Sequence, residues 1–164
     1  MKDYATNRTW SDQFLPEVKR QIGAHLLKVA PDDIDRREAT DLMMLDARDT
    51  RVAVRIRRPG YHQRYPHQFT IRSKVPSGAQ TELSKVVNGH GDWMFYGHAS
   101  ADGQTLDSWQ LLDLKAFRAA LIRHVQNGYP IVHGDQENWD GSAFKWFDVR
   151  SFPSEPPLVV AASG

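Results

Sequence analysis

The chain has 164 residues, the length of about one domain, with 40% hydrophobic and 25% charged residues. The absence of cysteine excludes disulfides, thiolate-bound zinc, iron–sulfur clusters and a cysteine nucleophile, and it fits a reducing, cytoplasmic location. No apolar run approaches the roughly 18–20 residues that span a membrane, and the first residues lack a signal-peptide stretch.

The net charge of +1 is the balance of two blocks of opposite sign. Residues 48–74 hold eight basic residues and one acid, a net charge of +7. Residues 92–140 hold seven acids and three basic residues, a net charge of −4. A concentrated positive block attracts polyanions, so this asymmetry is the first indication of function.

The first predicted elements are a helix and two strands. Residues 1–10 are polar and are predicted to be a flexible N-terminus. Ser11 is a plausible cap for a helix to about Lys28, in which hydrophobic residues recur every four positions. A strand over 41–46 and an alternating strand over 52–57 are predicted to form a hairpin through a short turn at 47–50.

Strands and helices then mix along the rest of the chain. In order, we predict a connection over 60–68, a strand over 69–75, a helix over 80–87, strands over 92–98 and 106–112, a helix over 114–126 capped by Asp113, a polar loop over 133–142, a strand over 143–152 and a tail over 153–164. This order predicts one α/β or α+β domain over 11–152, a mixed sheet flanked by helices.

The positive block has its sharpest element on the strand over 52–57. Arg55 and Arg57 are two residues apart and therefore project from one sheet face, which Arg51 shares. If the strand over 69–75 lies alongside, Arg72 and Lys74 join them. A row of such cations suits bidentate phosphate binding, and the alternative is a sheet edge kept soluble by charge.

The connection over 60–68 interleaves aromatic and basic side chains. Arg64 lies between His62 and His67, with Tyr61 and Tyr65 nearby. This pattern suits base stacking combined with phosphate contact. It suits an ordinary surface loop equally well.

Three further residues are candidates for chemistry. Asp41 stands at the start of a strand, where an acid either holds a divalent metal with partners or acts as a turn residue. Glu82 and Lys85 are three residues apart on one helical face, a spacing that also makes a simple ion pair.

Taken together, these residues resemble the PD-(D/E)XK nuclease-like superfamily. The strings VAVRIRR, FTIRSK, TELSKVVNGHGDWMFYGHA and WQLLDLKAFR are similar to small endonuclease-like proteins of phages and mobile elements, over residues 39–152. The resemblance implies a restriction-endonuclease-like core, in which a helix, three antiparallel strands, a helix and a further strand follow one another.

The resemblance also implies roles for the candidate residues. Asp41 matches a metal-binding aspartate, and Glu82 is placed to supply the second acid, so that both would hold Mg²⁺ during phosphodiester hydrolysis. Arg55 and Arg57 stand where the family carries an acid and a lysine, and they would clamp the phosphate. Lys85 would add a phosphate-binding cation.

The two arginines also support a second hypothesis, from a different functional class. A guanidinium repels a nearby metal ion, and arginine is a poor proton donor or acceptor near pH 7 because it stays protonated. A catalytically inert nuclease-fold protein would keep the basic face to bind nucleic acid or an acidic protein partner, for example as an inhibitor of a host defence system. A third hypothesis is a structural phage protein that assembles head to tail through its charge asymmetry.

Overall fold

The computed structural model describes residues 4–29, 42–44 and 51–164. The chain divides into two compact units, residues 1–50 and 51–164, and this boundary falls inside the range 11–152 predicted as one domain. Helices and strands mix in the second unit, in one mixed and one antiparallel sheet, so the predicted α+β class is confirmed. No helix in the described ranges is both long enough and apolar enough to cross a membrane.

The described residues of the first unit form two helices and a pair of short strands. Its elements are α1 (Tyr4–Asp12), α2 (Leu15–Leu26), β1 (Leu27–Val29) and β2 (Leu42–Met44), and β1 pairs with β2 antiparallel. Ser11 lies inside α1 and its hydroxyl donates to the Arg8 carbonyl at 3.0 Å, so its predicted role as a helix cap is wrong. Phe14 and Val18 are buried, which confirms the apolar face predicted for this region. Asp41 and the predicted turn at 47–50 lie outside the described residues.

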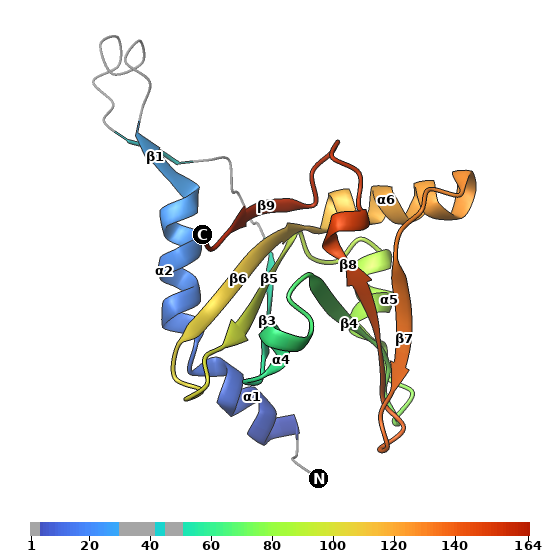
Figure 1. Cartoon of the computed structure of the whole chain (residues 1–164), viewed down its shortest axis with the longest axis horizontal. Helices are drawn as coiled ribbons and strands as arrows, with labels where there is room; N and C mark the ends of the chain where they lie inside the picture. The colour runs from blue at the N-terminus through green and yellow to red at the C-terminus, as the bar shows by residue number, and fades with distance from the viewer. Residues whose placement is uncertain (1–3, 30–41, 45–50) are drawn as a thin grey trace. The chain divides into compact units, whose positions relative to one another are not determined.

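The second unit is built on two sheets (Figure 1). The first has the order β3-β5-β6-β9 and consists of β3 (Val52–Arg57), β5 (Trp93–Ala99), β6 (Leu106–Asp113) and β9 (Val159–Ala162). The second has the order β4-β8-β7 and consists of β4 (Gln68–Lys74), β8 (Ala143–Asp148) and β7 (His133–Glu137). The helices are α4 (Tyr61–Arg64), α5 (Glu82–Val87), α6 (Leu114–Asn127) and the 3₁₀ turn η1 (Val149–Ser151).

Strand pairing differs from the arrangement that the resemblance implies. β2 pairs with β1, β3 lies parallel to β5, and β4 pairs with β8, so these three strands lie in three different sheets. Among the described strands, the hairpin predicted between the strands over 41–46 and 52–57 is therefore not formed. Arg72 and Lys74 on β4 also do not extend the sheet face of Arg55 and Arg57 on β3, as the sequence had led us to expect.

Three segments predicted as irregular contain regular structure. The connection over 60–68 contains the turn of helix α4, the polar loop over 133–142 contains β7, and the tail over 153–164 contains β9. β7 has the sequence HGDQE, which has neither apolar alternation nor β-branched residues. Its backbone is held by pairing with β8 from His133↔Phe147 to Glu137↔Ala143, so tertiary context overrides local preference.

The core of the second unit lies between the inner faces of its sheets and α6. Phe69 and Ile71 from β4, Phe147 from β8 and Phe117 from α6 are all 0–1% exposed. The predicted boundaries of α6 are confirmed: the Asp113 carboxylate accepts from the Lys115 and Ala116 backbone N–H groups, and the helix ends at Gly128 with φ +68°. This core fixes the two sheets against each other and leaves their other side chains to form a cavity.

Candidate functional site

Arg55 on β3 and Glu82 on α5, which the sequence placed in one site, are brought together by the fold. The Arg55 guanidinium lies 3.1 Å from the Glu82 carboxylate, and the two side chains are only 18% and 28% exposed. The same carboxylate oxygen accepts the backbone N–H of Arg72 at 3.2 Å. Glu82 occupies the first turn of α5, where Thr81 caps the helix by accepting from the Ser84 N–H. The ion pair that the sequence suggested between Glu82 and Lys85 is not among those of the described chain.

Glu82, the described half of the predicted Mg²⁺ site, already has a cation beside it. Asp41 lies outside the described residues. The carboxylate of Glu82 is already neutralised by a guanidinium, and a second cation at this oxygen would be repelled by Arg55. The described ranges contain no group of three or more His, Asp and Glu side chains placed to hold a metal ion.

Arg57 lies on the same face of β3 and has a different environment from Arg55. Its guanidinium carbon lies 4.0 Å from the centre of the Tyr61 ring and 5.6 Å from that of Phe144. Burial lowers the pKa of Arg57, and the charge of Arg55 acts in the same direction, although the nearby Tyr96 and Tyr61 side chains oppose this. Within the described chain Arg57 has no carboxylate within ion-pair distance, and its buried Nε has no hydrogen-bond partner.

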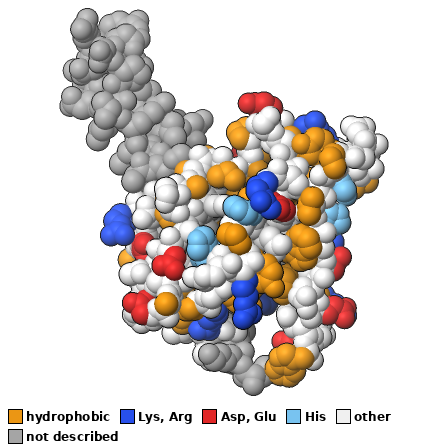
Figure 2. Space-filling view, viewed as in Figure 1, with side chains coloured by type: hydrophobic (Ala, Val, Ile, Leu, Met, Phe, Trp, Pro, Cys, Tyr) orange, Lys and Arg blue, Asp and Glu red, His pale blue; other side chains and the backbone are white. Residues whose placement is uncertain are grey.

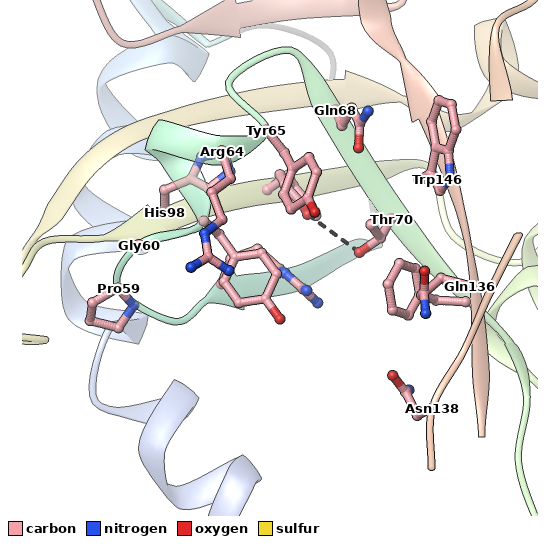
Figure 3. A pocket seen from close by; sticks show the side chains of 14 residues that line it. Pro59, Gly60, Arg64, Tyr65, Gln68, Thr70, His98, Gln136, Asn138 and Trp146 are labelled. Atoms are coloured by element: carbon pink, nitrogen blue, oxygen red, sulfur yellow. Dashed lines mark hydrogen bonds between the residues drawn. The ribbon is translucent and has the colours of Figure 1, made fainter. Parts of the chain in front are cut away.

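Arg57 opens into a cavity of about 620 Å³ between the two sheets, which we call the arginine cavity. Arg57 on β3 and the helix α4, with Tyr61 and Arg64, line one wall, and the sheet β4-β8-β7 supplies the other. Figure 3 shows Arg64 on one side of the cavity and Trp146 on the other. The cavity is lined by Arg57, Pro59, Gly60, Tyr61, Arg64, Tyr65, Gln68, Thr70, Tyr96, His98, Gln136, Asn138, Phe144 and Trp146. None of these described lining residues is Asp or Glu, so the cavity is positively charged. On the face of the molecule seen in Figure 2, basic side chains lie beside hydrophobic ones.

The other predicted nucleic-acid-binding residues separate into two groups. Arg51 pairs with Asp92 at 3.3 Å and Lys74 with Glu137 at 3.8 Å, so an acid of the same chain offsets each charge. Arg72 and Lys85 are exposed but do not line the arginine cavity. Of the predicted cations, only Arg57 and Arg64 combine a place in the cavity wall with the lack of an ion pair in the described chain.

Several cavity residues had no predicted role. Phe144 and Trp146 lie on β8, and Gln136 lies in the segment predicted as a loop. A signal was present in the alternation of β8: Ala143 and Phe147 are buried in the core, so the aromatic residues at 144 and 146 must face the other way. The local sequence carries no such signal for Gln136, because its segment becomes a strand only through pairing with β8.

His98 lines the cavity and belongs to a hydrogen-bonded chain. Its Nδ1 lies 3.0 Å from the Ser108 hydroxyl, which in turn lies 3.1 Å from Nδ1 of His62. Burial lowers the pKa of His98 to about 4, with the charges of His62 and Arg57 acting in the same direction. The imidazole next to Arg57 is therefore neutral near pH 7, and it does not compete with Arg57 for an anion.

This shift makes the stability of the fold depend on pH. Between about pH 6.5 and pH 4 the unfolded chain binds a proton at His98 that the folded chain does not, so the free energy of unfolding falls as the pH is lowered through this range. We expect this contribution to be about 2 kcal/mol, below the full value of the shift because the ring retains some hydration. Urea unfolding at several pH values measures it.

The control is His98→Asn, which keeps a polar group near Nδ1 but does not titrate. The variant is expected to lose less stability than the wild type between pH 6.5 and pH 4. Equal losses in the two proteins would contradict the assignment to His98, because the carboxylates that also titrate in acid are common to both.

Comparisons of the chain with protein-family models, with curated proteins and with solved structures returned no match. The resemblance to PD-(D/E)XK nucleases therefore stays a prediction.

Proposed function

We propose that this chain binds nucleic acid at the arginine cavity and that binding, without cleavage, is its activity. The observation that carries the proposal is the pair Arg57 and Arg64, which lines a cavity without acids and has no ion pair in the described chain. A partly buried guanidinium without a carboxylate costs folding free energy, and such groups concentrate at functional sites. Phosphate is the natural ligand of such a pair, because it takes bidentate hydrogen bonds from guanidinium.

The mixture of side chains around the arginines favours nucleic acid over a simple anion. Tyr61 holds the Arg57 guanidinium against its ring, while Tyr65 is 46% exposed at the cavity wall. Rings interleaved with cations contact bases and phosphates together. The Glu82 carboxylate is held by Arg55 and so does not repel phosphates from the cavity.

The test is the salt dependence of binding. Fluorescence anisotropy with a labelled oligonucleotide of about ten residues, single-stranded or duplex, gives the affinity of the full chain at rising salt. We expect log K to fall linearly with log salt, with a slope of about −1.4 for a single strand or about −1.8 for a duplex when two phosphates are neutralised. Absence of binding at low salt, or binding that salt does not weaken, would refute the proposal.

Hydrolysis is tested in the same samples by adding Mg²⁺ and following the length of the oligonucleotide. We expect uncut oligonucleotide. Cleavage that needs the metal and is lost in both Asp41→Ala and Glu82→Ala would establish the nuclease that the resemblance predicts, and it would overturn the part of the proposal that excludes cleavage.

A further inference from the structure

We propose that the arginine cavity takes one unpaired nucleotide, with its phosphate against Arg57 and Arg64 and its base against the aromatic wall of β8. This inference rests on the proposed function and adds a substrate class to it, namely single-stranded nucleic acid or an unpaired base within a longer strand. Three observations support it: the two walls of the cavity differ in chemistry, Trp146 packs on a glycine of the neighbouring strand, and the amide of Gln68 beside it makes no hydrogen bond in the described chain.

The two walls of the cavity differ in chemistry. Figure 3 shows Arg64 on one side and Gln136, Asn138 and Trp146 on the other. Strand register explains the second wall: on β8 Phe144 pairs with Gln136 of β7, and Trp146 pairs with Thr70 of β4, so these side chains share one sheet face. The two arginines lie on one wall together with Tyr61, and the amides lie on the other wall with Phe144 and Trp146. The cavity therefore offers partners for both the phosphate and the base of a nucleotide.

Trp146 is seated by a glycine on the neighbouring strand. Gly134 of β7 pairs directly with Trp146, and a Cβ at position 134 would lie 2.6 Å from three atoms of the indole. The indole therefore lies on bare backbone, at a place where any larger residue would displace it. In the described chain Trp146 makes no ring contact with another aromatic residue, although it lines the cavity.

An unengaged amide lies beside this indole. Gln68 lines the cavity, and its side chain makes no hydrogen bond within the described chain. It lies on β4, two residues before Thr70, the partner of Trp146, so Gln68 and the indole are neighbours on one sheet face. Amide side chains donate to and accept from the edges of bases, while indole rings stack on base faces.

These features select an unpaired base over a duplex. In a duplex each base is stacked on both faces by its neighbours, so the indole could not stack on a base face there. The cavity volume of about 620 Å³ lies within the range of small-ligand pockets, roughly 300–1,000 Å³. A nucleotide that leaves the stack satisfies both walls at once.

The experiment compares three oligonucleotides of about ten residues by anisotropy: a single strand, a duplex of the same sequence, and a single strand whose bases are replaced by abasic sites. We expect the wild-type chain to bind the single strand about 10-fold more tightly than either of the others, since only the base is missing from the abasic strand. Deoxyribose and ribose versions of the single strand distinguish DNA from RNA as the source of the nucleotide.

Two variants address the aromatic wall. Trp146→Leu removes the indole, and Gly134→Ala displaces it while leaving it in the chain. Both are expected to weaken binding of the single strand about 10-fold and to leave binding of the abasic strand unchanged. The matched control is Trp139→Leu, because Trp139 is 87% exposed and does not line the cavity, and its binding is expected to equal that of the wild type.

The outcomes separate this inference from the proposed function. Equal binding of the single strand and the abasic strand by the wild type overturns the inference, whether or not the variants fold, and leaves phosphate binding intact. Tighter binding of the duplex overturns it as well. Loss of all binding, including that of the abasic strand, overturns the proposed function itself.

Discussion

Replacing Arg57 and Arg64 by glutamine is expected to weaken binding of a single-stranded oligonucleotide about 10- to 100-fold at low salt. Both arginines line the arginine cavity, and neither has an ion pair in the described chain. Their loss also removes about two phosphate contacts, so the slope of log K against log salt becomes shallower by about 1.4. Anisotropy titrations at several salt concentrations measure both effects.

A matched control removes the same charge from outside the cavity. Arg51→Gln with Lys74→Gln also deletes two cations, but each is already paired with an acid, Asp92 or Glu137. We expect this variant to bind less than about 3-fold more weakly than the wild type. Equal effects in the two double variants would mean that overall charge attracts the oligonucleotide and that the cavity has no special role. Arg64→Gln alone, at an exposed residue, covers the case in which the change at Arg57 disturbs folding.

Replacing Phe69 by alanine is expected to lower the free energy of unfolding by about 3–5 kcal/mol. The Phe69 side chain is fully buried. The centre of its ring lies 5.3–6.4 Å from the ring centres of four other aromatic residues, Tyr96, Phe117, Phe147 and Phe152. Removing it leaves a cavity at the point where β4, β5, β8 and α6 meet. Urea unfolding followed by circular dichroism measures the loss.

Val125→Ala is the control for this prediction. Val125 lies on α6 and is 81% exposed, so its truncation is expected to change stability by less than about 0.5 kcal/mol. A loss below about 1.5 kcal/mol at Phe69 would show that the ring cluster repacks around the gap.

Local features of the fold were predictable from the sequence. Alternating apolar residues identified β3, and the pair of Asp113 and Gly128 gave the two ends of α6. These features depend on neighbours in the chain, which a sequence displays directly. Strand order was not predictable in the same way: β3 pairs in parallel with β5 across the intervening α4, β4 and α5, and such partners are selected by packing of the whole core.

The candidate site shows the same division. The two-residue repeat of a β-strand predicted that Arg55 and Arg57 share one face of β3, and both do lie on one face. Charge counting did not distinguish cations with partners from cations without, because Asp92 and Glu137 are 41 and 63 residues from Arg51 and Lys74 along the chain. The aromatic wall was missed for a related reason, since Gln136 and Trp146 become neighbours only when β7 joins β8.

The positions of Arg55 and Glu82 in their ion pair are not interchangeable, although the two charges alone would allow the exchange. Exchanging the two residues would restore an ion pair, yet the oxygen of Glu82 also accepts the backbone N–H of Arg72, and a guanidinium has no acceptor to offer there. One carboxylate thus fastens a strand of each sheet to the start of α5, in a single permitted orientation. Related sequences are therefore expected to conserve a hydrogen-bond acceptor at position 82 more strictly than a cation at position 55.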